Sequence, residues 1–480
     1  MALTPINLGS APNDGRGDNL RTAGEKINAN FDVVEAVLGT IPTGIEGAGA
    51  RSFANVAALL ATNQITYSSG SNQVVAGNIL RTMAEGHIYE VQASTVPSPN
   101  GVTHLNVNGV GLIMRRGRLT ADCQVQVPVH FSTMQAAVNY YAQLTPGKQW
   151  FEMRVNTGFE PTSGMVFEGH DFSRFRIMGQ TTNGAPNPSS NETAAGDIRV
   201  STNFTGNFIH VLGCPGPRLG NFSSSPCVVN MRSRGGNGIL LDHHSSITVG
   251  WNSGVIYAAE NGLSSSRSSI VAIGAVFRHC GISGMRLSMA TSAEIRGADC
   301  SWAGYQGNSS PDAGIGIFVS RNSSIHADTG GGAGPTKANN CAKWGLRVHR
   351  AYFSGWLMEA QNNGEIGVRA AHGAIVNLLE ARLSNNPVGV RADDLATVTM
   401  RNSTCNNSGT RSVECWGARI DARNANCRRN PASDGLDDFR VYQGGEILAW
   451  GAQGGSRNGI NNRTENGVIR GQDSQTVPPR

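Results

Sequence analysis

The most chemically suggestive residues are Asp242, His243 and His244, which follow one another in the chain. A carboxylate with two imidazoles offers metal ligands, or a base that titrates near neutral pH. Successive residues of a strand point to opposite faces, which hinders ligation of one metal by all three. We therefore predict no metal and no cofactor, and keep Asp242 and His243 as weak catalytic candidates.

The same cluster belongs to a longer ridge of polar residues of both charge signs, four and five residues after recurring glycines. The ridge also contains Arg321, His349, Asp393 and Asp394. Glycoside hydrolysis needs two carboxylates about 5 to 9.5 Å apart, and a lyase needs a base beside an acidified carbon. No acidic pair stands out, so Asp393 and Asp394 remain weak catalytic candidates. The ridge is either a groove that binds or cleaves a sugar polymer, or a row of solvated turns.

Aromatic residues are a second signature of sugar binding. Trp251, Trp302, Tyr305 and Trp344 all lie in the region that contains the glycines, and the last three border stretches of unusual length. We add Arg321 and His349 to these four as glycan-binding candidates. The alternative, that the rings cap a core at turns, has equal weight.

A repeat of about 22 residues must position these side chains. Its anchors are glycines followed by an apolar residue, at Gly238, Gly262, Gly284, Gly316, Gly345, Gly367, Gly389 and Gly417. A second column contains Ile247, Ile270, Ile295, Ile325, Ile375 and Val398, with one marker missing near Phe353. A third contains Cys280, Cys300, Cys341, Asn363, Asn385, Cys405 and Cys427. Three short strands per coil predict a right-handed parallel β-helix over 126–440, with inert buried cysteines.

The sequence before the repeat divides into two parts. In 1–45, Leu20, Ile27, Phe31, Val34 and Leu38 follow a seven-residue spacing that predicts a self-associating helix, preferably three-stranded. The alternative is an amphipathic helix that docks on its own domain. Residues 46–125 predict a small α+β module, and a helix at 134–144 is placed to cap the repeat. A β-rich trimerisation or cap segment is expected at 441–480.

Composition excludes several classes of protein. The 480 residues carry 39 Lys and Arg against 34 Asp and Glu, and the basic residues are scattered, so we expect no nucleic-acid partner. There is no apolar run of 18 residues, so we expect no membrane insertion. The first residues, MALTPIN, do not resemble a signal peptide, which predicts synthesis in the cytoplasm.

Three segments resemble bacteriophage tailspike and tail-fibre proteins. They are PINLGSAPNDGRGDNLRTAGEKINANF at 5–31, VVAGNILRTMAEGHIYEVQAS at 74–94 and VYQGGEILAWGAQGGSRNGINNRTENGVI at 441–469. The resemblance implies a homotrimer on the virion, docked to phage tail or other virion proteins by its N-terminus, with β-helices that meet a host surface glycan. Three hypotheses stay open: a spike that binds polysaccharide, a polysaccharide depolymerase (hydrolase or lyase) on the same scaffold, and a purely structural fibre or decoration protein. The lack of an acidic pair favours the first.

Overall fold

The computed structural model describes most of the chain between 122 and 471 and selected parts of the region before it. The described residues of the first part are 26–27, 50–54, 56–61, 66–67, 73–74, 78–82, 88–91, 104–107, 111–116 and 119. Those of the second are 122–471 without 146, 157, 180–197, 222–225, 305–309, 331, 429–437 and 454–466. The chain forms two compact units, Met1–Arg118 and Leu119–Arg480.

The first unit contains the predicted small α+β module. Its five-stranded sheet has the order β1 (Ala50–Phe53), β4 (Ile79–Thr82), β5 (Ile88–Val91), β7 (Gly111–Arg116) and β6 (His104–Val107). The helix α2 (Val56–Leu60) buries Leu59 against Leu80 and Tyr89. A separate pair joins β2 (Thr66–Tyr67) and β3 (Gln73–Val74). The strand Cys123–Val127 pairs with Phe151–Val155 and belongs to the second unit.

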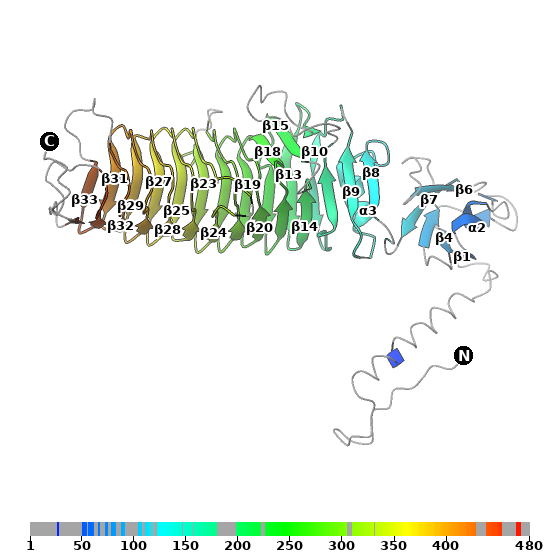
Figure 1. Ribbon diagram of the computed structural model, residues 1–480. Coiled ribbons are helices and arrows are strands. Elements are labelled where there is room, and N and C mark those ends of the chain that lie inside the picture. The colour runs from blue at the N-terminus through cyan, green and yellow to red at the C-terminus, as the bar shows by residue number, and fades with distance from the viewer. Residues whose placement is uncertain are drawn as a thin grey trace, which may run out of the picture. The chain divides into compact units, whose positions relative to one another are not determined.

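The second unit is a parallel β-helix, which confirms the predicted fold class (Figure 1). One sheet of the described residues contains, in stacking order, β10 (Ser163–Glu168), β13 (Thr205–Leu212), β16 (Ile239–Asp242), β19 (Asn261–Ser266), β21 (Ser283–Ser288), β23 (Ile315–Ser320), β25 (Trp344–His349), β27 (Ile366–Ala371), β29 (Val388–Asp393), β31 (Arg411–Trp416) and β33 (Phe439–Tyr442). We call it the long-strand sheet.

A second sheet, the groove sheet, runs along another side of each coil. It contains β8 (Cys123–Val127), β9 (Phe151–Val155), β11 (Phe175–Met178), β14 (Pro215–Leu219), β17 (Ser246–Val249), β20 (Ser269–Ala272), β22 (Ser292–Glu294), β24 (Ser324–His326), β26 (Tyr352–Ser354), β28 (Ile375–Asn377), β30 (Thr397–Thr399), β32 (Arg419–Asp421), β34 (Glu446–Leu448) and β35 (Val468–Arg470). The third side has β12 (Ile198–Arg199), β15 (Val228–Arg234) and β18 (Gly254–Ala258), then single bridges from Val276 to Gln453.

Inward residues of the groove sheet form one apolar ladder. Ile247 pairs with Ile270, Ile325 with Phe353, and Val376 with Val398. Phe353 is thus the marker missing from the predicted column. Two predicted members are corrected: Ala293 occupies the position assigned to Ile295, and Val376 that assigned to Ile375, whose side chain points outward and is 53% exposed.

At the anchoring glycines the backbone packs too closely against neighbouring residues to admit a side chain. A Cβ on Gly345 would lie 2.7 Å from the backbone oxygen of Gly367 and 2.8 Å from the Cβ of Ala360, so a side chain has no room. The last predicted anchor is wrong by five residues: Val390 pairs with Val413, which places Ser412, not Gly417, on the next coil after Gly389. Gly417 has φ +57° and follows β31 in a turn.

Both ends of the repeat differ in detail from the prediction. The predicted cap is α3 (Met134–Tyr141), whose N-cap Thr133 accepts a hydrogen bond from the backbone N of Ala136, and Tyr140 and Tyr141 pack on Phe151. At the other end the coils continue past 440, because β33 pairs with β31 and β34 with β35. The segment expected as a separate unit at 441–480 therefore begins as ordinary coils.

The predicted self-associating helix lies almost wholly outside the described residues. Lys26 and Ile27 are helical, and Ile27 is 42% exposed, while Leu20, Phe31, Val34 and Leu38 fall outside them. Among the described residues, no helix is long and apolar enough to cross a bilayer.

Candidate functional site on the groove sheet

The outer face of the groove sheet carries two adjoining depressions that share Val271. Their floor is low because three stacked outward residues, Ser246, Ser269 and Ser292, are small. The same column continues with Ser324 and the larger Tyr352. The two depressions adjoin at Val271 and follow one another along the stack of coils, and we call them together the groove. An extended polymer could lie along such a surface.

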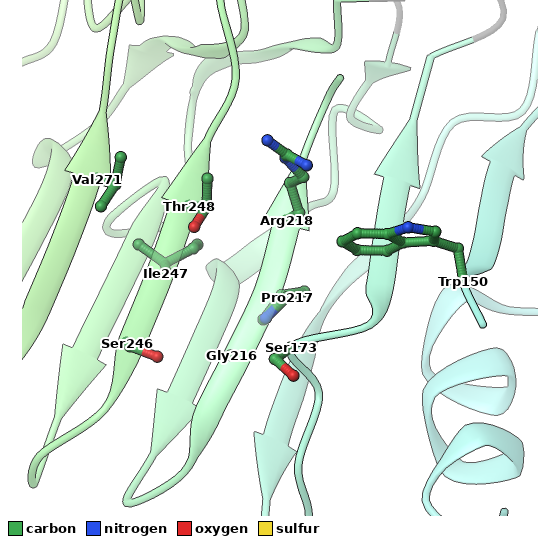
Figure 2. Close-up of a pocket in the computed structure, with 9 residues that line it drawn as sticks. All are labelled: Trp150, Ser173, Gly216, Pro217, Arg218, Ser246, Ile247, Thr248 and Val271. Carbon is green, nitrogen blue, oxygen red and sulfur yellow. The ribbon is translucent and has the colours of Figure 1, made fainter. Parts of the chain in front are cut away.

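The proximal depression, nearest the N-terminal cap, has a volume of about 260 Å³. Figure 2 shows the ring of Trp150 directed from one side towards Arg218 and Pro217, with Ser246 on the strand beyond them. The backbone N of Trp150 donates a hydrogen bond to Oδ1 of Asp122 (2.8 Å), which fixes the loop before β9. The depression thus combines an aromatic ring with a guanidinium, two groups that recognise sugars and their acidic substituents.

Arginines surround Trp150. The Cζ atoms of Arg176, Arg174 and Arg218 lie 3.5, 4.8 and 5.8 Å from the ring centroid. Arg176 also donates to Oε2 of Glu152 at 3.3 Å. Burial, and secondly the charge of Arg176, lower the pKa of Arg218.

The distal depression has a volume of about 380 Å³ and contains ionisable groups of both signs. Glu294 pairs in register with His326 of the next coil, and Asp328 follows two residues later. Glu294 forms an ion pair with Arg296 (2.6 Å). Asp328 accepts hydrogen bonds from Oγ of Ser354 and from the backbone N of Trp356, both at 2.8 Å. Two carboxylates and an imidazole therefore line one depression, and such groups can perform acid–base chemistry on a sugar.

The predicted catalytic candidates lie elsewhere, at the ends of long-sheet strands and in the turns that follow them. Oδ2 of Asp242 accepts a hydrogen bond from Nε2 of His210 at 3.2 Å, and His243 and His244 are exposed with positive φ. Asp393 is 4% exposed and bridges Nε of Arg369 and Nε of Arg391. These contacts give Asp393 a structural role.

Two ridge residues, His349 and Asp394, come together through His372. The rings of His349 and His372 meet edge to face with centroids 4.4 Å apart, and Nδ1 of His372 lies 2.8 Å from Oδ2 of Asp394. Arg321 is exposed on a neighbouring coil with φ +54°. The ridge is therefore a real surface feature, but it lies outside the two depressions.

The predicted aromatic residues are dispersed over several sides of the coil. Trp344 is 9% exposed, donates from Nε1 to Glu365, and lies beneath the guanidinium of Arg347. Trp251 covers Gly274. Trp302 is 37% exposed and stacks on His279, which stacks on Tyr257. Tyr305 lies outside the described residues.

None of the predicted site residues that the structure describes therefore lines the groove. Sequence reasoning missed Trp150, Arg218, Glu294 and Asp328. The sequence offered one signal, because Asp328 immediately precedes the second long stretch of the repeat, 329–340. Among the residues that the structure describes, no group of three or more His, Cys, Asp or Glu side chains could hold a metal ion.

No family model and no curated protein matches the chain. Among solved structures it is similar to the enzymatically active domain of tailspike protein 2 from bacteriophage CBA120, with 12% identity over 93% of this chain and 65% of that one, and a TM-score of 0.42. It is also similar to full-length tailspike protein 2 of an Escherichia coli O157:H7 bacteriophage (12% identity, 93% and 58% covered, TM-score 0.40) and to Dettilon tailspike protein (9%, 68% and 64%, 0.37). The chain spans less than two thirds of the length of these tailspikes, and the likeness is one of β-helix architecture.

Proposed function

We propose that this chain is a tailspike-like subunit of a phage virion that binds host surface polysaccharide along the groove sheet. The observation that carries the proposal is the pair of adjoining depressions, with Trp150 and Arg218 in one, Glu294 and Asp328 in the other and small serines between them. Sugar sites combine such concavity with a few polar groups that fix orientation. The resemblance of segments 5–31 and 441–469 to tail proteins supplies the phage setting.

The groove can be tested by filling it. Ser269→Trp introduces a bulky side chain on the floor of the distal depression, where Ser269 is exposed. Thr397→Trp is the matched control, because Thr397 lies in the same outward column beyond the groove. We expect that the purified Ser269→Trp variant no longer binds host cells and no longer competes with the phage for adsorption. The Thr397→Trp variant should bind and compete as the unmodified protein does. Equal binding by both variants would show that the groove is not the binding site.

Assembly into a homotrimer and docking by the N-terminus belong to the same proposal. The heptad positions in 1–45 support them, because a helix of about three heptads is marginal alone and gains stability by association. Phe31→Asp with Val34→Asp in the full chain should lower the mass measured by light scattering from three copies to one. An unchanged mass would show that these two residues do not hold the subunits together.

A depolymerase on the same scaffold is the second candidate, favoured by Glu294 and Asp328 in one depression. One carboxyl group would protonate the leaving oxygen while the other activates water or attacks the sugar. Spotting the protein on a host lawn, with an assay for reducing ends and unsaturated sugars, decides between the two. Activity that Glu294→Gln removes would establish the enzyme; full binding without shortening of the polymer would establish the binding protein.

A further inference from the structure

A residue in the left-handed backbone region follows each strand of the long-strand sheet from β16 to β29. Ser320 pairs with His349, so the next residues, Arg321 and Arg350, lie on neighbouring coils about one strand spacing apart. The equivalent residues of successive coils form one exposed stack, which we call the turn row. Its members have φ between 49° and 56° and are His243, Arg267, Met289, Arg321, Arg350, His372 and Asp394.

The backbone conformation does not explain the arginines of the turn row. Asparagine is a usual occupant of the left-handed region, because its short polar side chain can hydrogen-bond locally. The corner before the long-strand sheet follows this rule, with φ between 54° and 61° at Asn340, Asn362, Asn385 and Asn407. Arginine has no such advantage in this conformation. Its presence at Arg267, Arg321 and Arg350 therefore indicates a role for the side chain itself.

The three guanidiniums of the turn row have no hydrogen bond or ion pair within the described part of the chain. Other stacked arginines of the same sheet have a carboxylate: Asp393 accepts from Nε of Arg369 at 2.9 Å and from Nε of Arg391 at 2.8 Å. Like charges directly opposite each other on neighbouring strands are destabilising. The protein supplies an anion for Arg369 and Arg391, and it supplies none for Arg321 and Arg350.

The surroundings of these two arginines add positive charge. Their neighbours in the chain are serine, asparagine, histidine and alanine, and none is acidic. Burial, and then nearby positive charges that include His372 and Arg350, lower the pKa of His349. The acid of the turn row, Asp394, lies 2.8 Å from Nδ1 of His372. This edge of the sheet therefore has a positive charge that the described residues do not balance.

We propose that Arg321 and Arg350 bind a phosphate monoester of the host surface polymer, at a second attachment site outside the groove. Each guanidinium can donate two parallel hydrogen bonds to an acidic group. A carboxylate has one negative charge and two oxygens, which one guanidinium satisfies. A phosphate monoester has close to two negative charges and three terminal oxygens, which suit two guanidiniums. The inference rests on the proposed function for the host polymer, and it names phosphorylated sugars as the ligand class.

The test compares two immobilised polymers, dextran phosphate and carboxymethyl dextran of equal charge density, with unmodified dextran as the reference surface. Biolayer interferometry measures the binding of the full-length protein to each. We expect saturable binding to dextran phosphate that is at least roughly tenfold tighter than binding to carboxymethyl dextran. Equal binding to the two acidic polymers, or no binding to dextran phosphate, would overturn the proposal.

A pair of double variants locates the site. Arg321→Asn with Arg350→Asn introduces a residue type that the left-handed turns of this chain accept, so the melting temperature should not fall. We expect this variant to bind dextran phosphate at least roughly tenfold more weakly. Arg382→Asn with Arg419→Asn removes the same charge from side chains that are 66% and 59% exposed elsewhere on the coils, and should bind as the unmodified protein does. Equal losses would show non-specific attraction to a basic protein and reject the site.

The outcome can be separated from that of the groove test. Ser269→Trp should bind dextran phosphate normally, because Ser269 lies on the groove sheet and not in the turn row. If Ser269→Trp abolishes cell binding but the unmodified protein does not bind dextran phosphate, this inference alone fails. If Arg321 and Arg350 are needed for dextran phosphate while Ser269→Trp still binds cells, the groove fails and this inference stands.

Discussion

Nε of Arg369 lies 2.9 Å from Oδ2 of Asp393, one coil further along the long-strand sheet. The other oxygen of the same carboxylate accepts a hydrogen bond from Nε of Arg391 at 2.8 Å. Arg391 in turn lies over the ring of Trp416, at 5.0 Å. A single buried carboxylate therefore holds the guanidiniums of two consecutive coils, and such a ladder stabilises the stack only while the carboxylate is present.

The first prediction concerns that carboxylate. Asp393→Ala leaves two arginines beside a buried position without their shared acceptor, and breaking a buried ion pair from one side costs roughly 3 kcal/mol. Asp394→Ala is the control, because the side chain of Asp394 is 57% exposed. We expect a clear fall in the melting temperature for Asp393→Ala and little change for Asp394→Ala. A similar small effect for both would show that the arginine ladder does not stabilise the fold.

The second prediction concerns the inward glycines. A Cβ on Gly389 would overlap Sγ of Cys405 and lie 2.6 Å from the backbone oxygen of Ser412. Gly389→Ala should therefore lower the melting temperature, since overpacking a core costs about 1 to 3 kcal/mol. Gly334→Ala is the control, because nothing lies within 4 Å of the added methyl group. Equal melting temperatures would mean that the coils can separate to admit a methyl group.

The repeat was predictable from the sequence because stacking imposes the same demand on every coil. Gly345 and Gly367 occur at equivalent positions because neither has space for a side chain. The sequence misassigned inward positions where two neighbouring residues of a strand are equally apolar. Ile375 is as apolar as Val376, and only the pairing of strands shows which of them points inward.

The groove was not predictable in the same way. Ser246, Ser269 and Ser292 form its floor because they are small. A serine on the outer face of a strand has no chemical signature in the sequence. Trp150 precedes the recognised anchors, and Glu294 seemed isolated until Asp328 was placed in the same depression. Asp328 belongs to a stretch of irregular length, where a column of equivalent residues cannot be followed.

The buried cysteines give a third prediction. Burial raises the pKa of Cys280 and of Cys341 to about 12. At pH 8 the thiolate fraction of such a group is roughly one in ten thousand, and the thiolate is the reactive form. Iodoacetamide followed by mass spectrometry should detect no alkylation of these two residues in the native protein, and complete alkylation in denaturant. Rapid alkylation of either one in the native state would contradict their burial.

The same shift predicts a dependence of stability on pH. The unfolded thiols ionise near their ordinary pKa of 9.0, whereas the folded thiols keep their protons up to about 12. Between these values the unfolded state binds fewer protons, so stability is fully present below pH 9 and falls as the pH rises. Replacing both cysteines by alanine should flatten this fall relative to the unmodified chain; an unchanged slope would assign it to other groups.

The last prediction concerns His349. Burial lowers its pKa below the ordinary 6.5, and the adjacent His372 and then Arg347 and Arg350 lower it further. His372→Gln removes one of these charges, so NMR titration of the ring should show a higher pKa for His349 that still lies below 6.5. His243→Gln, at a distant exposed turn, should leave the titration unchanged. Because the unfolded histidine takes up its proton first, His349 lowers stability as the pH falls below 6.5, and His372→Gln should reduce that loss. An identical titration in the two variants would show that the ring of His372, 4.4 Å away, does not influence His349.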